Sequence, residues 1–114
     1  MSKIVRAANA IALNSNKIDR VVRKRSEYFF LYDKKHTWSI SLNEDIYSLF
    51  YYPGDESYDD TCNRTSWEED DYMHYSTKGL NTREAYDTFR DLYQIVKEKV
   101  FGINKVLDDI IGGD

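Results

Sequence analysis

The stretch EYFFLYDKKHTWSISLNEDIYSLFYYP, residues 27–53, decides the fold of this chain and holds more than half of its aromatic residues. Aromatic and β-branched residues form three runs in it, at 27–33, 36–42 and 45–52, and short polar turns separate them. Residues of these types pack well on a pleated sheet and favour strands. The stretch therefore predicts two consecutive hairpins of an antiparallel sheet.

The second run alternates cleanly between apolar and polar residues, and such a period of two places every second side chain on one face of a strand. The side chains expected to face the core are Trp38, Ile40 and Leu42. The third run is apolar at nearly every position. A turn of two or four residues would add Leu49 and Tyr51 to the Trp38 face, whereas a three-residue turn would reverse the two faces of that strand.

The turn between the first two runs sets their register. A two-residue turn at Lys34–Lys35 would pair Asp33 with His36, and Leu31 would then lie opposite Trp38. Because Lys-Lys is not the favoured Asn-Gly type, a loop longer by one or two residues is the alternative. Under the pairing of Asp33 with His36 the other face carries three aromatic residues, Tyr28, Phe30 and Tyr32. That face is open to a ligand if no helix covers it, and it belongs to the core if helices cover both sides of the sheet.

Helical patterns lie before and after this stretch. Apolar residues recur three and four positions apart over 2–13 and again over 17–25, so two short helices or one bent helix are expected. A long helix is predicted over 82–101, with Asn81 as its cap and Gly102 at its end. Its inward stripe is expected to comprise Ala85, Phe89, Leu92, Val96 and Val100. A short amphipathic helix is predicted over 103–111.

Charge changes sign along the chain. Residues 1–53 hold nine Lys and Arg against five Asp and Glu, whereas residues 54–81 hold two against eight. All eight of these acids lie in 55–72, which is predicted to be a long loop with a helical turn near 66–71, where Ser66 would act as a cap. Residues 72–77 are expected to add a fourth strand at the edge of the sheet.

Together these patterns predict one α+β domain over residues 1–114. Its sheet is expected to have three or four antiparallel strands, joined to an N-terminal helical segment, a long C-terminal helix and a short final helix. A single cysteine, Cys62, excludes an internal disulfide, and no apolar run is long enough to span a membrane. These two observations predict a cytoplasmic protein that does not bind a membrane.

His36, His74 and Cys62 are the side chains best suited to metal binding or nucleophilic catalysis. Their spacing matches no metal-binding motif, and no nucleophile elbow or phosphate-binding loop surrounds them. The acidic surroundings of Cys62 are expected to raise the pKa of its thiol, and His36 is expected to pack on Tyr51. No metal, cofactor or catalytic residue is therefore predicted, and an unrecognised small enzyme is the third-ranked alternative.

A protein partner is the first-ranked prediction. Tyr and Trp are common anchors of protein interfaces, and complementary charge steers association. An acidic loop beside aromatic residues is typical of small inhibitors, immunity proteins and adaptors, and by analogy the partner would be basic or would handle nucleic acid. The predicted partner-binding residues are Asp59, Asp60, Trp67, Glu68, Glu69, Asp70, Asp71 and Tyr72.

The alternative is a nucleic-acid or nucleotide binder that uses the basic segment 20–35. Cations would contact phosphate there, and aromatic residues on an open sheet would stack on unpaired bases. The residues predicted for this role are Arg20, Arg23, Lys24, Arg25, Tyr28, Phe30 and Tyr32. The net charge of −4 ranks this alternative second.

Overall fold

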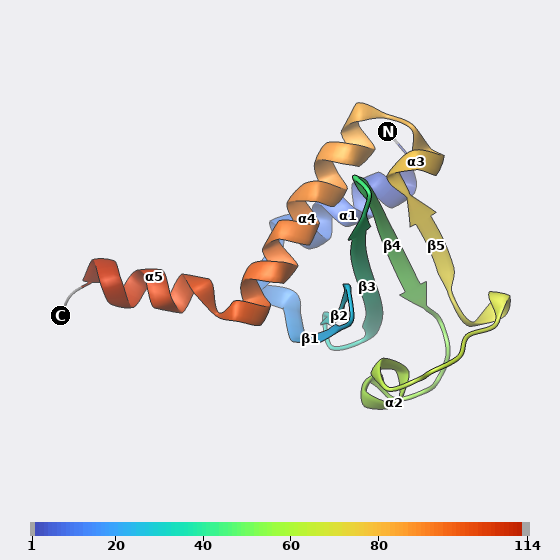
Figure 1. The fold of residues 1–114 in the computed structure, drawn as a ribbon, viewed down its shortest axis with the longest axis horizontal. Coiled ribbons are helices and arrows are strands. Elements are labelled where there is room, and N and C mark those ends of the chain that lie inside the picture. The colour runs from blue at the N-terminus through green and yellow to red at the C-terminus, as the bar shows by residue number, and fades with distance from the viewer. Residues whose placement is uncertain (1, 113–114) are drawn as a thin grey trace.

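The computed structural model describes residues 2–112, which form a five-stranded antiparallel sheet with its two longest sheet-packed helices on one face (Figure 1). Each strand pairs with the next in chain order. The strands are β1 Ile18–Lys24, β2 Glu27–Tyr32, β3 His36–Asn43, β4 Ile46–Tyr52 and β5 Met73–Ser76. The helices are α1 Lys3–Leu13, η1 Ser15–Lys17, α2 Tyr58–Cys62, η2 Glu69–Asp71, α3 Thr77–Leu80, α4 Arg83–Phe101 and α5 Ile103–Gly112. The predicted α+β fold is confirmed, with one strand more than expected.

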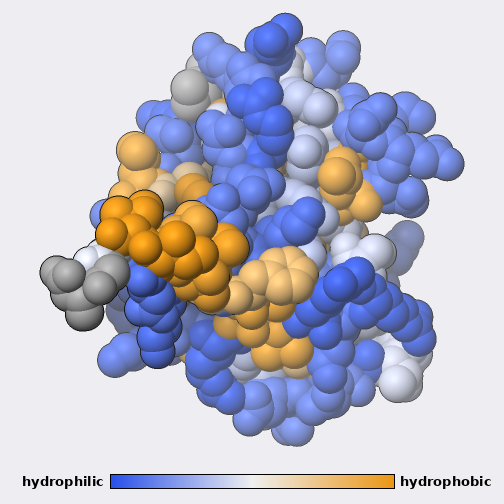
Figure 2. Space-filling view, turned by 60° about the vertical axis from the view of Figure 1, so that its left-hand side comes forward, coloured by the Kyte–Doolittle hydropathy of each residue, from blue (hydrophilic) through white to orange (hydrophobic). Residues whose placement is uncertain are grey.

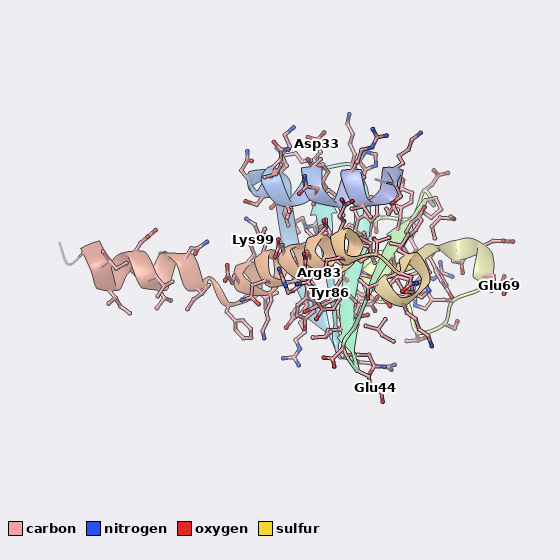
Figure 3. All side chains as sticks on the ribbon, turned by 90° about the horizontal axis from the view of Figure 1, so that it is seen from above. Asp33, Glu44, Glu69, Arg83, Tyr86 and Lys99 are labelled. Carbon is pink, nitrogen blue, oxygen red and sulfur yellow. The ribbon has the colours of Figure 1, made fainter. Side chains whose placement is uncertain are left out.

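The main core lies between the sheet and the two helices α1 and α4, which run side by side over one sheet face (Figures 1 and 3). The expected inward stripe of α4 is confirmed at its fully buried positions, which are Ala85, Phe89, Leu92 and Val96. Thr82, rather than Asn81, caps α4 by accepting a hydrogen bond from the backbone N–H of Ala85. Gly102 ends the helix with a φ of 59°, as expected. None of the helices within residues 2–112 has both the length and the apolar character needed to cross a bilayer.

The predicted helix over 17–25 is wrong, because most of these residues form β1. Arg20 adopts a φ of 53° at a β-bulge, so that Arg20 and Val21 together lie opposite one residue of β2. The bulge shifts the alternation by one position, and Ile18 and Val21 therefore face the helices while Val22 faces the other side. Apolar residues at 18, 21 and 22 imitate helical spacing for this reason. Strand β1 is the additional strand of the sheet.

The predicted register of the first hairpin is wrong by one residue. Tyr32, not Asp33, pairs with His36, and a three-residue turn joins the strands. The shift exchanges the two faces of β2, because neighbouring side chains point to opposite sides of a strand. Phe30 therefore lies opposite Trp38 and is 0% exposed beneath the helices.

The predicted faces of the second hairpin are confirmed, although its two-residue turn lies at residues 44–45 rather than 43–44. Tyr51 pairs with Trp38, and Leu49 lies on the same sheet face. The turn residues are Glu44 and Asp45, whose φ angles are 50° and 65°. Two consecutive positive φ angles match the twist of a hairpin, but side chains other than Gly and Asn adopt them at a steric cost. The expected edge strand is also confirmed, because β5 pairs with β4.

Replacing Asp45 by glycine is expected to raise the free energy of unfolding by about 0.5–1 kcal/mol. Glycine adopts a positive φ without strain, and its greater freedom in the unfolded chain offsets part of the gain. Urea denaturation of the variant and the wild type measures the difference. Lys35→Gly is the matched control, because Lys35 lies in a turn without a positive φ, and this change is expected to destabilise the protein. Equal effects of the two substitutions would contradict the strain at Asp45.

Candidate functional site

Residues 55–72, here called the acidic segment, lie across the sheet face opposite α1 and α4. Four residues are buried where the segment meets the sheet, namely Phe29, Tyr52, Tyr58 and Cys62. Trp67 and Tyr72 pack against them, with the Trp67 ring 4.9 Å from that of Tyr52. The sequence predicted a loop with one helical turn. The structure has two short helices, α2 and η2, and Glu68 rather than Ser66 caps the second of them.

Contacts between α2 and β1 hold the first part of the acidic segment. The Tyr58 hydroxyl donates a hydrogen bond to the backbone carbonyl of Arg20, whose guanidinium pairs with Asp59 and lies 5.0 Å from the Tyr58 ring centroid. The Lys24 ammonium donates to the side-chain oxygen of Asn63 at 3.1 Å. The basic strand and the acidic segment, which the sequence suggested as alternative binding sites, therefore neutralise each other in part.

Arg64 joins the two ends of the acidic segment. Its guanidinium lies 2.9 Å from the carboxylate of Asp71 and 3.7 Å from that of Glu56. The same group stacks over the Trp67 ring at 4.5 Å from the centroid. Asp71 in turn accepts a hydrogen bond from the backbone N–H of Glu68 at 2.8 Å, within a capping box. Sequence reasoning missed Arg64, although it is the one cation among eight acids.

The exposed residues Glu68, Glu69 and Asp70, here called the acidic tip, project beyond this frame. No ion pair involving any of the three occurs among residues 2–112. Figure 3 shows Glu69 at the margin of the molecule, far from Asp33 and Glu44. The three carboxylates therefore retain their charge for an external partner.

A cavity of about 230 Å³ lies beside the acidic tip. Four carboxylates line it, those of Asp55, Glu56, Asp70 and Asp71, together with the Arg64 guanidinium and the Trp67 ring. Its ionised lining carries a net charge of −3, since one cation offsets four anions. Such a lining favours a positively charged group, because close opposite charges attract across a partly dehydrated surface.

The eight predicted partner-binding residues thus have different roles in the structure. Trp67 and Tyr72 pack on the sheet, and Asp59 and Asp71 are paired with arginines. Of the eight, the exposed acids that form no ion pair with any residue of 2–112 are Asp60, Glu68, Glu69 and Asp70. Asp60 lies on α2, and the other three form the acidic tip.

Beneath the acidic segment, a polar cluster connects β2, β3 and β4. The Ser39 hydroxyl donates a hydrogen bond to the Glu27 carboxylate, and the Tyr52 hydroxyl donates to the same carboxylate at 3.3 Å. The two hydroxyl oxygens lie 2.7 Å from each other. Burial raises the pKa of the Tyr52 phenol, and the nearby Glu27 charge adds to the shift. Tyr52 is therefore a neutral hydrogen-bond donor that helps to hold Glu27.

The candidate catalytic side chains do not share a site. Cys62 lines a cavity of about 390 Å³ near Glu27 and Lys24, and neither histidine lines it. His74 stacks on Phe50, whereas His36 packs near Tyr51, as expected. The pKa of the Cys62 thiol is raised, as the sequence predicted, but burial contributes more than the acidic neighbours do.

Metal ligands do not gather within the described part of the chain either. No three His, Cys, Asp or Glu side chains of residues 2–112 lie close enough together to hold an ion. The acids of the segment instead bind Arg64 and Arg20 or point into solvent.

The structure separates the residues proposed for nucleic-acid binding. Arg23, Lys24 and Arg25 remain exposed on β1 and its turn. The expected aromatic platform is absent, because Tyr28 is 4% exposed and Phe30 lies beneath the helices. The other members of the set are Arg20, paired with Asp59, and Tyr32, partly buried against the main core. The exposed cations of the segment therefore lie apart from Tyr28 and Phe30, which the helices cover.

Comparisons with models of protein families, with curated proteins and with solved structures gave no match to this chain.

Proposed function

We propose that this protein is a non-catalytic binding protein of the inhibitor, immunity or adaptor type, and that it recognises a basic surface on a protein partner. The acidic tip makes the first contact, and the cavity beside it accepts a Lys or Arg side chain. The observation that carries the proposal is this cavity, in which four carboxylates and one guanidinium surround a tryptophan. A partner that normally handles nucleic acid would present cations of this kind.

The frame of the acidic segment supports this proposal. Arg64, the capping box and the packing of Trp67 hold the cavity walls before any partner arrives. Binding to such a preformed surface immobilises few additional groups, and it therefore loses less entropy than binding to a flexible loop. Exposed carboxylates at the tip would accelerate the encounter, while the cavity would slow dissociation.

Two other functions have less support. The cations of β1 are exposed and could contact nucleic acid, but Tyr28 and Phe30, the aromatic residues proposed for stacking, lie under the helices. The side chains best suited to catalysis do not converge, because the buried Cys62 and the two histidines occupy separate parts of the fold. The protein-binding proposal uses the three carboxylates of the acidic tip, which are exposed and form no ion pair among residues 2–112.

Reversing the charge of the acidic tip is expected to weaken partner binding by at least about tenfold, because several favourable charge contacts become repulsive. The variant is Glu68→Lys/Glu69→Lys/Asp70→Lys. A tagged chain is used to recover its partner from lysate of the source cells at low salt, and the affinity of the purified pair is then measured by calorimetry. We expect a stoichiometric complex that salt weakens.

The matched control is Asp33→Lys/Glu44→Lys/Glu84→Lys, which makes the same change of charge on exposed positions outside the acidic segment. It is expected to leave the affinity within about threefold, because distant exposed charges are screened by salt. Failure to recover a protein, or equal weakening by the two triple variants, would overturn the proposal. Binding that neither variant changes would overturn it as well.

A further inference from the structure

Helix α5 projects from the end of α4 away from the sheet (Figure 1). Its apolar side chains are exposed, with Val106 at 46%, Leu107 at 45%, Ile110 at 72% and Ile111 at 81%. A helix of ten residues is only marginally stable in water unless its apolar stripe packs against something. The exposed stripe therefore indicates a surface that is covered when the protein assembles.

Apolar exposure is concentrated at this end of the molecule. Seven large apolar side chains are exposed among residues 2–112, and all except Met73 belong to α5, the end of α4 or the end of α1. The members outside α5 are Phe101 and Leu13, the second being 77% exposed. Figure 2, in which the α5 end of the molecule is turned toward the reader, shows apolar surface gathered there. Scattered apolar residues need no explanation, whereas a patch of this kind marks an interface.

The same chain offers a groove suited to this helix. A cavity of about 370 Å³ lies between α1 and α4, with Ala12, Leu13 and Ile95 as its apolar lining. Its remaining lining residues are polar, namely Asn9, Thr88, Asp91 and Gln94. An apolar helix laid into an apolar groove with a polar rim is a common mode of helix recognition.

The charges of α5 and α1 are complementary. Helix α1 contains Lys3 and Arg6 and no acid, and α4 holds four cations and four acids, of which Asp91 lines the groove. The two helices of the groove thus have a positive net charge, whereas α5 contains Asp108 and Asp109 against one cation, Lys105. Bringing α5 to the groove therefore pairs opposite net charges. The acidic character of α5 also argues against a lipid surface, since membrane-bound amphipathic helices are usually rich in Lys and Arg.

An antiparallel arrangement satisfies both the apolar and the charged contacts. With a helical rise of about 1.5 Å per residue, Asp109 lies about 9 Å along α5 from Ile103, and Arg6 lies about 10.5 Å along α1 from Leu13. Placing Ile103 beside Leu13 of another copy therefore brings Asp109 level with Arg6 along the helix axes, at the edge of the contact. The same contact forms twice in a two-fold dimer, because each copy supplies one helix and one groove.

We infer that α5 of one copy docks in the α1–α4 groove of a second copy, antiparallel to α1, and that the reciprocal exchange forms a two-fold dimer. The contact is independent of the acidic tip, so its test and the test of the proposed function can fail separately.

The test is sedimentation of the full chain over a range of concentrations, with two variants that each damage one half of the contact. Ile110→Asp places a charge on α5, and Leu13→Asp places one at the groove. Each is expected to raise the dimer dissociation constant by at least about 100-fold, because a carboxylate would be buried without a partner. The control is Met73→Asp, which alters an exposed apolar residue on β5 and is expected to have no effect.

A charge-exchange series tests the register. Arg6→Asp and Asp109→Arg are each expected to weaken the dimer, and the double variant is expected to recover most of the wild-type affinity. All these positions are exposed, and circular dichroism verifies that each variant is folded. A wild-type monomer at every concentration up to about 1 mM would overturn the inference. A dimer that Ile110→Asp or Leu13→Asp does not weaken would overturn it as well, as would a failure of the double variant to recover affinity.

Discussion

Replacing Phe30 by alanine is expected to lower the free energy of unfolding by about 3–5 kcal/mol, which is the range for removing a buried aromatic ring. The Phe30 side chain is fully buried, at the centre of the sheet face that α1 and α4 cover. Its loss leaves a cavity that these helices cannot fill without giving up their own contacts. A small domain has a total stability of about 5–15 kcal/mol, so this single change removes a large part of it.

Leu31→Ala is the matched comparison, because Leu31 is the next residue of β2 and faces the acidic segment. It is half-buried, and its truncation is expected to cost about 1–2 kcal/mol. Urea denaturation of both variants measures the difference. A larger loss at Leu31 than at Phe30 would contradict the observed register, because it would mean that the two faces of β2 are exchanged.

This comparison tests the point at which sequence reasoning about the sheet failed. Lys34–Lys35 looked like a two-residue turn, but Asp33 also belongs to the turn and adopts a φ of 55°. Local sequence rarely distinguishes a turn of two residues from one of three, since Asp and Lys fit both. A difference of one residue exchanges the faces, and the unbroken apolar run 28–32 of β2 fits either choice equally well.

The error at β1 has a different cause. The bulge at Arg20 adds one residue to the strand, which destroys the period of two and leaves apolar residues at helical spacing. Strand pairing with β2 and the contact of α2 with Arg20 stabilise the bulged conformation. The pairing partner of the bulge lies in the next strand, and Tyr58 lies 38 positions further along the chain. A short window of sequence around Arg20 therefore does not contain the residues that stabilise the bulge.

Helix α4 shows what local sequence does specify. Its stripe of apolar residues, its acidic first turn and its terminal Gly102 all depend on neighbours within one or two helical turns. The acidic segment shows the intermediate case. Its composition predicted an acidic surface, but the division into paired and free acids depends on Arg64 and Arg20, whose partners lie 7 to 39 positions away.

Replacing Trp67 by alanine is expected to release much of the acidic segment from the sheet and to lower the free energy of unfolding by about 2 kcal/mol. This is less than the full cost of removing a buried indole, because Trp67 is half-buried. The ring packs on Tyr52, and the Arg64 guanidinium stacks over the same ring. Its removal therefore weakens both the apolar contact with the sheet and the orientation of the cation that joins the two ends of the segment.

Hydrogen exchange distinguishes this local release from a general loss of stability. Backbone amides of α2 and η2 are expected to exchange faster in Trp67→Ala, whereas those in the centre of α4 should change only with global stability. Trp67→Phe is the control, because it keeps an aromatic contact with Tyr52, and it is expected to preserve most of the protection. Unchanged protection of η2 in the alanine variant would show that Arg64 and the capping box hold the segment without the indole.

The same variant separates the two contributions to the proposed function. Trp67→Ala leaves every carboxylate of the acidic tip in the chain, so the charge that steers the encounter is unchanged. What it removes is the fixed geometry of the cavity, in which Arg64 and Asp71 are held against the ring. We therefore expect the association rate with a basic partner to remain within about threefold and the dissociation rate to rise by about tenfold or more, because order in the segment must then be gained on binding.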